Sequence, residues 1–316
     1  MKALRFINGK PRIEEVPEPA VAQDVAVIKI DRAGVCNTDL EILKGYHNFE
    51  GTIGHEFVGT VSDAQDKSLI GKRVVADINQ ACTKCDICKN GGMHHCPNRT
   101  VIGIVSQEGA FAEYLAASVS SLVEVPQDIS LEKIVFAEPV AAALEIQEQL
   151  NLNTENAICV IGDGKLGLLI AMTLDKSGYE VHLVGRHPER IERLGNYNGT
   201  YKLSATEKTY AVVIEATGNP QGFQTAMSLV RPRGHLVLKS TYAAPFEFNP
   251  SMLVVNEINV IGSRCGPMNK AVEQIASGKI DPSTLIDAQM PLEKGLEALE
   301  HAQKKGVLKV LIEFPG

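Results

Sequence analysis

Apolar and polar residues follow two different rhythms along the chain, and the change falls near Leu131. Before that point, short β-rich runs alternate with glycine and proline, a pattern typical of a small barrel or sandwich. The predicted strands are Val25–Ile30, Phe57–Val61, Arg73–Ile78 and Ala112–Leu115. The first part of the chain is therefore predicted to form a β-rich domain.

After that point, helical stretches alternate with apolar strands. Such alternation is the signature of a doubly wound parallel sheet, an α/β arrangement with helices on both faces. We predict a helix over Val140–Leu150, followed by strands at Ala157–Ile161, Val181–Val184, Ala211–Ile214, His235–Leu238 and Ile258–Ile261. A helix near Asn269–Ser277 and a strand near Val307–Phe314 make up a tail too short for its own core. We expect this tail to fold back onto the N-terminal domain.

The composition narrows the classes of protein. A length of 316 residues with 44% hydrophobic residues is enough for two domains. Lysine and arginine total 31 against 38 acidic residues, a formal charge of -7 that disfavours nucleic acid as a partner. No apolar stretch reaches the roughly 18 to 20 residues of a membrane span, and the N-terminus lacks the pattern of a signal peptide. We therefore expect a cytoplasmic protein with no membrane partner, in which the seven cysteines indicate metal binding rather than disulfides.

A glycine-rich turn follows the strand predicted at Ala157–Ile161 and opens a helical run. In this setting G-x-G-x-x-G predicts a dinucleotide site: Gly162 permits a tight turn, Gly164 lets the backbone approach a pyrophosphate, and Gly167 lets helix and strand pack closely. The helix N-terminus favours phosphate, because its unpaired N–H groups and its dipole attract an anion. The alternative is a plain turn between strand and helix. The predicted cofactor-binding residues here are Gly162, Asp163, Gly164, Lys165, Leu166 and Gly167.

The end of the second strand bears on which nicotinamide cofactor is expected. An acidic residue would stand there if the ribose carried a free 2′-hydroxyl. Gly185 and Arg186 stand there instead, which leaves room for a 2′-phosphate and offers it the donor fork of a guanidinium. The sequence therefore favours NADP over NAD, with His187 and Arg190 as candidate further contacts. The alternative is that Arg186 only solvates a strand end.

Four cysteines, Cys82, Cys85, Cys88 and Cys96, fall within fifteen residues. Four thiolates at such spacing can converge tetrahedrally on one ion, and a site of this kind leaves no position open for chemistry. We interpret the cluster as a structural zinc site that holds a loop with few apolar residues.

Two other kinds of four-cysteine site compete with this interpretation. An iron–sulfur cluster is the stronger competitor, but ferredoxin-like runs use a shorter last interval and usually a second set of cysteines. A zinc ribbon that binds nucleic acid is disfavoured by the acidic balance and by the adjoining dinucleotide motif. His94 and His95 lie inside the loop, and we interpret them as surface residues rather than ligands.

A second group of metal-ligating residue types is dispersed along the chain: Cys36, His55, Glu56 and Glu138. Each has a structural alternative, since a single buried cysteine is usually core and a Glu-Pro pair can merely begin a helix. Their order relative to the dinucleotide motif favours a second, catalytic metal site.

Jointly, these motifs resemble the zinc-containing medium-chain dehydrogenase/reductase family over nearly the whole chain. The resemblance implies a GroES-like catalytic domain formed by residues 1–139 with 267–316, and a Rossmann domain formed by residues 140–266. It adds Thr217 and Gly218 to the expected cofactor contacts. The residues that carry it are Gly34 to Asp39, Gly54 to Glu56 with Gly59, the four-cysteine loop, Glu138-Pro139, Gly162 to Gly167, Glu215 to Gly218 and the LKV near the C-terminus.

The resemblance also assigns roles around a catalytic zinc. It implies that Cys36 and His55 are ligands and that Glu138 is the third protein ligand, at a position where many relatives have cysteine. Glutamate there is more similar to the polyol and sugar dehydrogenase branches. Glu56 would sit beside the metal, as a neighbour or as an exchangeable ligand.

A path for the substrate's proton is implied as well. Thr38 matches the family's hydroxyl that hydrogen-bonds the substrate oxygen and passes its proton outward. Farther out, Glu41 stands where some relatives have a histidine. His47 is a candidate substitute, and an exposed loop histidine is an equally good interpretation of it.

The implied activity is that of a zinc-dependent oxidoreductase that transfers hydride between an alcohol, polyol or sugar and NAD(P). A zinc with three protein ligands keeps one position open, where a substrate hydroxyl can lose its proton near neutral pH. Two zinc ions per chain, a small-molecule substrate and a homodimer or homotetramer are expected. The alternatives are a zinc-independent NADPH quinone or enone reductase and a non-catalytic NADPH-binding protein. Both are disfavoured because every ligand position has a candidate.

Overall fold

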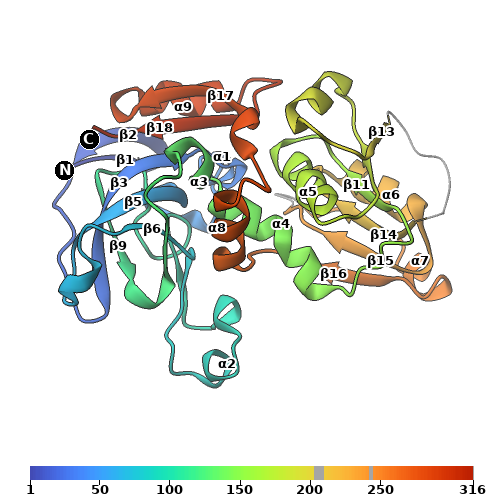
Figure 1. Ribbon diagram of the computed structural model, residues 1–316, viewed down its shortest axis with the longest axis horizontal. Helices are drawn as coiled ribbons and strands as arrows, with labels where there is room; N and C mark the ends of the chain where they lie inside the picture. The colour runs from blue at the N-terminus through green and yellow to red at the C-terminus, as the bar shows by residue number, and fades with distance from the viewer. Residues whose placement is uncertain (203–209, 242–244, 316) are drawn as a thin grey trace. The chain divides into compact units, whose positions relative to one another are not determined.

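The computed structural model describes residues 1–202, 210–241 and 245–315. The chain divides into two compact units, shown with its elements in Figure 1. The first unit is Met1–Glu138 with Ala271–Ala276 and Ile286–Gly316, and the second is Pro139–Lys270 with Ser277–Leu285. Among the described residues, none of the helices combines the length and the apolar character that crossing a bilayer requires.

The first unit is built mainly of antiparallel strands. Its largest sheet has the order β10-β6-β5-β3-β18-β17, with β9 also paired to β3, and smaller sheets have the orders β2-β1-β4 and β7-β8. The strands are β1 Lys2–Ile7, β2 Lys10–Glu15, β3 Val25–Gly34, β4 Gly51–Thr52, β5 Glu56–Asp63, β6 Arg73–Ala76, β7 Asn79–Gln80, β8 Thr100–Val101, β9 Tyr114–Ser118, β10 Leu122–Glu124, β17 Ile286–Pro291 and β18 Lys309–Glu313. The C-terminal strand β18 thus lies between β3, with which it pairs antiparallel, and the edge strand β17.

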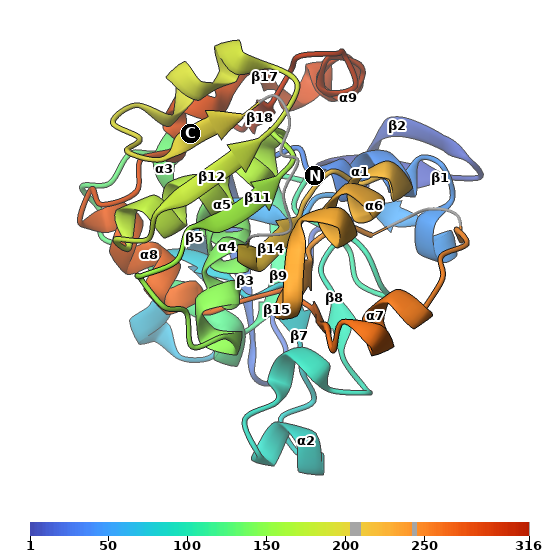
Figure 2. The same ribbon diagram turned by 90° about the vertical axis from the view of Figure 1, so that its right-hand side faces the viewer.

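Helices of the first unit are short and lie at its edges. A lobe that carries α2 projects from the unit in both views (Figures 1 and 2). The helices are α1 Asn37–Ile42, α2 Asp86–Lys89, α3 Leu131–Ile134, α9 Gly295–Ala302 and most of α8 Met268–Ala276. The 3-10 turns are Tyr46–Asn48, Lys67–Leu69, Met93–His95, Val119–Ser121 and Leu292–Lys294.

The second unit is a six-stranded, wholly parallel sheet of order β13-β12-β11-β14-β15-β16. Its strands are β11 Ile158–Ile161, β12 Val181–Val184, β13 Thr200–Lys202, β14 Tyr210–Glu215, β15 Val230–Leu238 and β16 Asn259–Gly262. Its helices are α4 Ala137–Gln149, α5 Lys165–Lys176, α6 Pro220–Leu229 and α7 Ser251–Val255, with 3-10 turns at Pro188–Leu194 and Pro282–Leu285. The order reverses between β11 and β14, and sheets of this kind bind ligands beyond the strand ends at such a reversal. The predicted α/β class is confirmed.

The central strands of the parallel sheet could be predicted from the sequence because they are largely buried and therefore consist mainly of apolar residues. All four residues of β11 are buried, as expected for a strand with helices on both faces. At the sheet edge, β16 is largely exposed and its apolar residues Val260 and Ile261 are not covered within the chain's core. The hairpin of β1 and β2 and the strand β17 were not predicted. Charged residues interrupt all three strands, and β2 and β17 contain no buried residue.

One glycine of the first unit is required by close packing. Gly54 lies directly before His55 with φ +96°, and a Cβ there would overlap the ring of Phe111. Phe111 is fully buried, so it has no room to move away. Gly45 has the same φ of +96°, but a Cβ there would meet nothing within 4 Å. A comparison of alanine substitutions at the two glycines therefore distinguishes the cost of backbone strain from the cost of a steric clash.

We expect Gly54→Ala to lower the free energy of unfolding by about 1–3 kcal/mol more than Gly45→Ala does. Both variants place alanine at positive φ, but only the first forces the core apart. Denaturant unfolding of the two variants measures the difference. Equal losses would mean that backbone conformation alone makes Gly54 necessary.

Candidate active site

Three metal-ligating side chains of the first unit converge. Ligand atoms of Cys36, His55 and Glu56 all lie within 4.8 Å of one another. Cys36 is the N-cap of α1, and His55 and Glu56 stand at the start of β5, so a helix end and a strand end bring them together. His55 and Glu56 are buried and Cys36 is half-buried. The donor set of a thiolate, an imidazole and a carboxylate suits zinc.

Asp39 holds this group in place. Its fully buried carboxylate accepts hydrogen bonds from the backbone N–H of Cys36 at 2.8 Å and of Gly54 at 3.2 Å. It also lies 3.1 Å from Nδ1 of His55. When Nδ1 donates to this carboxylate, the lone pair of Nε2 is presented for a metal. Burial lowers the pKa of His55, but Asp39 and Cys36 outweigh it and hold that pKa well above 6.5.

Glu56 has a buried counter-ion. Lys309, from β18, donates to Glu56 Oε2, and both side chains are almost inaccessible to water. The ammonium also lies 5.1 Å from the ring centroid of Phe136, within the range of a cation–π contact. Lys309 compensates the charge of Glu56, and Asp39 faces the ring of His55, so both buried carboxylates have a basic partner.

Glu138 lies near this cluster but outside it. Among the described residues, its carboxylate is not part of the group within 4.8 Å. Burial is the main cause that raises the pKa of Glu138 to about 7. The charge of His55 acts to lower this pKa, and the charge of Glu56 acts to raise it. Its role as third ligand stays a prediction, as does the choice between Glu56 and Glu138.

The proposed proton path is only partly assembled. Thr38 Oγ1 lies 3.8 Å from Cys36 Sγ, at the first turn of α1. His47 is exposed, has φ +59° and packs edge-on against Tyr46 with ring centroids 4.2 Å apart. It lines a surface pocket with Phe49 and Glu50, so its place in a relay stays a prediction.

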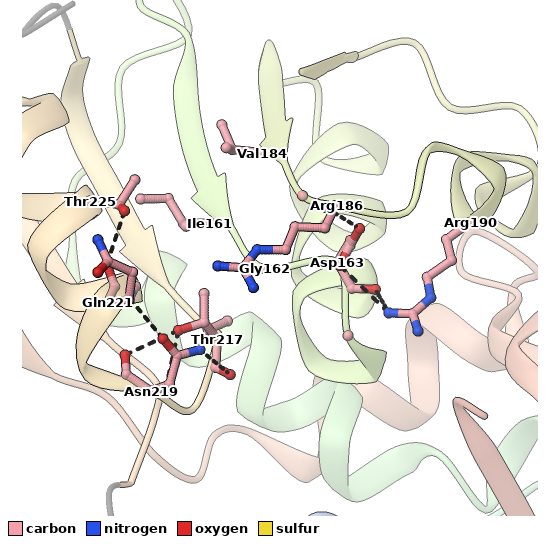
Figure 3. Close-up of a pocket in the computed structure, with 14 residues that line it drawn as sticks. Ile161, Gly162, Asp163, Val184, Arg186, Arg190, Thr217, Asn219, Gln221 and Thr225 are labelled. Carbon is pink, nitrogen blue, oxygen red and sulfur yellow. Dashed lines mark hydrogen bonds and ion pairs between the residues drawn. The ribbon is translucent and has the colours of Figure 1, made fainter. Parts of the chain in front are cut away.

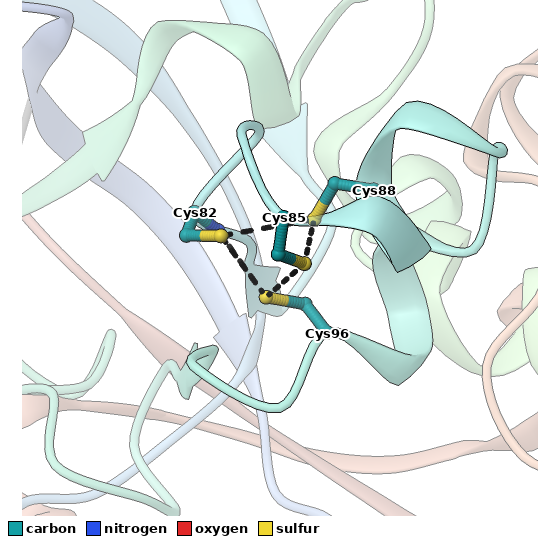
Figure 4. A group of neighbouring side chains, drawn as sticks. All are labelled: Cys82, Cys85, Cys88 and Cys96. Carbon is teal, nitrogen blue, oxygen red and sulfur yellow. Dashed lines mark hydrogen bonds between the residues drawn. The ribbon is translucent and has the colours of Figure 1, made fainter.

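The four cysteines of the projecting lobe do come together (Figure 4). Their Sγ–Sγ distances of 3.4, 3.5, 3.8 and 4.0 Å bracket the value of about 3.8 Å expected for four sulfurs at 2.3 Å from one zinc ion. Disulfides would require about 2.05 Å. The described residues therefore fit a tetrahedral metal site and supply no additional ligand to it.

His94 has a partner that the sequence did not indicate. Its Nε2 lies 2.5 Å from Asp77 Oδ2, and Asp77 also accepts from the backbone and side chain of Asn79. Burial raises the pKa of Asp77, but His94 and Asn79 lower it below its usual value overall. His94 therefore attaches the cysteine lobe to the body of the first unit, whereas His95 is exposed.

The glycine-rich turn of the second unit has a distinct geometry at each glycine. Gly162 has φ +111°, and a Cβ there would lie 2.6 Å from the carbonyl oxygen of Ala216. A Cβ at Gly164 would meet nothing within 4 Å, so the backbone is open to a ligand. A Cβ at Gly167 would overlap the carbonyl oxygen of Gly162, which shows how closely α5 packs on the turn.

A pocket of about 410 Å³ lies over this turn (Figure 3). Of the predicted cofactor residues, Gly162, Asp163, Gly164, Gly185, Arg186, Arg190 and Thr217 line it; Lys165, Leu166, Gly167, His187 and Gly218 do not. The pocket is also lined by residues that were not predicted: Ile161, Val184, Ala216, Asn219, Gln221, Gly222 and Thr225. Asn219 could have been found as the N-cap before Pro220, which opens α6.

Two of the predicted phosphate contacts are held by Asp163. Nδ1 of His187 lies 3.2 Å from Asp163 Oδ1, and Arg190 Nη1 donates to the Asp163 carbonyl oxygen at 2.9 Å. The guanidinium of Arg186 extends into the pocket (Figure 3) and makes no hydrogen bond or ion pair with a described residue. Arg186 is thus the cation available to a ligand there, and a role for His187 and Arg190 at a phosphate stays a prediction.

Comparison with known proteins agrees with this architecture. Residues 22–127 match the family described as "Alcohol dehydrogenase GroES-like domain", and residues 166–277 match "Zinc-binding dehydrogenase". The chain is 27% identical to the sorbitol dehydrogenase of Bacillus subtilis, over 99% of this chain and 97% of that protein. It is also 27% identical to the erythritol/L-threitol dehydrogenase of Mycolicibacterium smegmatis, over 90% of each. The solved alcohol dehydrogenase of Thermus sp. ATN1 superposes with a TM-score of 0.89, at 26% identity and over all of both chains.

These matches define the class as zinc-type, nucleotide-linked oxidoreductases. The chain belongs to the zinc-containing medium-chain dehydrogenase/reductase family. The predicted GroES-like and Rossmann folds are confirmed, and so is the prediction of an alcohol-dehydrogenase-type oxidoreductase that uses zinc and NAD(P) on a small molecule. The zinc-independent reductase and the non-catalytic protein are not favoured.

The pH dependence of stability tests the environment of Asp163. Burial acts to raise the pKa of this carboxyl, but hydrogen bonds from His187, Tyr201 and the backbone lower it overall. Its ionised form therefore stabilises the fold above the unfolded pKa near 3.9, and that stability is lost as the pH falls through the lower, folded-state pKa. We expect Asp163→Asn to lose about 1–3 kcal/mol at pH 7 and progressively less below about pH 5.

Denaturant unfolding at pH 7, 4, 3 and 2 measures this gap between the variant and the natural chain. Asp63→Asn is the control, because its carboxylate and its partner Lys67 are both exposed and solvent screens their attraction. A gap for Asp163→Asn that stays constant from pH 7 to pH 2 would contradict the expected linkage.

Proposed function

We propose that the chain oxidises a polyol or a related secondary alcohol with NADP, at a catalytic zinc held by Cys36, His55 and Glu138. The observation that carries the proposal is the convergence of Cys36, His55 and Glu56 within 4.8 Å. The polyol class is supported by the relatives named above and by a carboxylate, rather than a thiol, at position 138.

The residues of the cluster have different roles in the proposed reaction. Cys36 and His55 bind the metal, and Asp39 orients both through the bonds described above. Glu56, paired with Lys309, would lie beside the metal, and either it or Glu138 would be the third protein ligand. Thr38 hydrogen-bonds the substrate hydroxyl and receives its proton, and His47 takes that proton toward solvent. When bound, zinc lowers the pKa of a hydroxyl and polarises a carbonyl, and NADP supplies the hydride acceptor.

Several broader features belong to the same proposal. The catalytic domain comprises residues 1–139 with 267–316 and the cofactor domain residues 140–266, with the four cysteines holding a structural zinc. The chain assembles into a homodimer or homotetramer through the exposed edge strand β16 and the neighbouring Val254 and Val255, which are 77% and 79% exposed. A cytoplasmic location is supported by thiols that are free and spaced as metal ligands.

The activity is tested by following reduced cofactor while the zinc-loaded protein meets primary alcohols, secondary alcohols, polyols and aldoses with NADP or NAD. We expect Cys36→Ser to lower turnover by about 10³-fold or more, because the metal contributes several kcal/mol to the transition state. Cofactor affinity should be kept, and bound zinc should fall from two ions per chain to one. Cys159→Ala, which removes a buried thiol outside both clusters, should keep both ions and the activity.

Turnover that survives Cys36→Ser with one zinc ion lost would remove that metal from the mechanism. If the natural chain binds zinc and cofactor but oxidises none of these alcohols, its substrate is an alcohol outside the panel or a carbonyl compound that it reduces.

The cofactor preference is tested at Arg186. We expect Arg186→Asp to weaken NADPH binding by about 100-fold, since a bidentate charge-assisted contact becomes a repulsion, and to leave NADH binding nearly unchanged. Equilibrium titration with each reduced cofactor gives the two dissociation constants. Arg231→Asp, at an exposed arginine that does not line the pocket, is the matched control. If Arg186→Asp keeps the preference for NADP, the assignment fails.

A further inference from the structure

The space beside Gly185 is occupied by a side chain from another part of the fold. Gly185 follows β12 and is buried. A Cβ built on it would lie 2.5 Å from Cγ and 2.6 Å from Cβ of Asp163, and would overlap the carboxylate oxygen as well. Rotation of the Asp163 side chain about χ1 does not remove the clash, because the backbone fixes the position of its Cβ. A side chain at position 185 would therefore require the glycine-rich turn or the end of β12 to move.

The carboxylate of Asp163 is held by the loop that it faces. Oδ2 accepts from the backbone N–H of Arg186 at 2.8 Å, from that of His187 at 2.6 Å and from the Tyr201 hydroxyl at 2.9 Å. Oδ1 lies 3.2 Å from Nδ1 of His187 and 3.5 Å from Nη1 of Arg190. The side chain is only 8% exposed.

These contacts decide what Asp163 can do. Oδ2 already accepts three hydrogen bonds, and Oδ1 faces the ring of His187 and the guanidinium of Arg190. The carboxylate is thus engaged by the loop and not directed at a ribose hydroxyl, although it lies near the strand end where dinucleotide-binding folds place the acid that binds ribose. Its contacts instead hold the backbone from which Arg186 extends into the pocket (Figure 3).

We propose that Asp163 is a positioning residue that sets the cofactor preference, by excluding an acid at position 185 and by holding the backbone that carries Arg186. This rests on the proposed use of NADP. The preference is thus encoded in two contacting positions, one in the glycine-rich turn and one after β12. An acid at position 185 selects NADH only when Asp163 is also replaced.

A double-mutant cycle tests the coupling, with Asp163→Gly, Gly185→Asp and the two combined. Asp163→Gly removes both the carboxylate and the Cβ that fill the space. We expect Gly185→Asp alone to weaken both NADPH and NADH, because its side chain displaces Asp163 from the loop. In the double variant the new acid has room, so NADH should bind about tenfold more tightly than the two single effects predict. Additive effects on the dissociation constant for NADH would overturn the proposal.

A second measurement covers the case in which Gly185→Asp does not fold. Gly185→Ala should lower the thermal unfolding temperature by several degrees, and Asp163→Gly should restore part of that loss in the combined variant. Gly262→Ala is the matched control, since Gly262 also ends a strand of this sheet and a Cβ there would meet nothing within 4 Å. If Gly185→Ala is as stable as Gly262→Ala, the exclusion does not exist.

The cycle and the proposed function fail in different ways. The coupling is measured on NADH binding and on stability, so it does not depend on which cofactor the natural chain prefers. Asp163→Gly alone should also reduce the ratio of NADPH to NADH affinity about tenfold, because Arg186 loses its support. If the effects of Asp163→Gly and Gly185→Asp on NADH binding are additive while Arg186→Asp strongly weakens NADPH binding, the proposed use of NADP stands. Only the proposed role of Asp163 is then wrong.

Discussion

The carboxylate of Asp39 is the contact on which the chemistry of the first unit depends. It ties the start of α1 to the approach of β5, through the N–H groups of Cys36 and Gly54, and it orients the ring of His55. Two ligand types from separate elements are therefore positioned by one buried group. Buried charges are costly unless paired and hydrogen-bonded, so an arrangement of this kind persists only where every partner is present.

The same reasoning explains the charge balance nearby. Glu56 is buried beside the thiol and the imidazole, and its counter-ion Lys309 comes from a strand 253 positions later in the chain. The lysine neutralises Glu56, while the other buried carboxylate, Asp39, faces the ring of His55. In the second unit Asp163 shows a related arrangement: its charge is satisfied within the loop, and the arginine left over faces a pocket.

The sequence predicted much of this because the informative features are local. The strand, turn and helix around Gly162 are contiguous, and four cysteines within fifteen residues can meet without knowledge of the fold. The contacts that were missed join distant segments. Asp39 is part of a sequence motif, but its role in orienting His55 becomes evident only from the fold, which places Gly54 and His55 next to its carboxylate. Asp163 appeared as the variable position of a glycine motif, and only the fold shows that it fills the space of residue 185. A lysine directly before three consecutive apolar residues of the terminal strand was the signal that could have revealed Lys309.

The place of β18 in the sheet has a consequence for synthesis. The second unit is almost continuous in sequence, whereas the first needs a strand that follows the second unit along the chain. Until β18 has been synthesised, Glu56 lacks the ammonium of Lys309, and burial of its carboxylate without that counter-ion would cost about 3–5 kcal/mol. Domains generally fold as units during synthesis, with N-terminal ones first. Here the second unit can form before β18 has been synthesised, whereas the first is completed only afterwards, so the two units are expected to mature in the reverse of the order in which they begin.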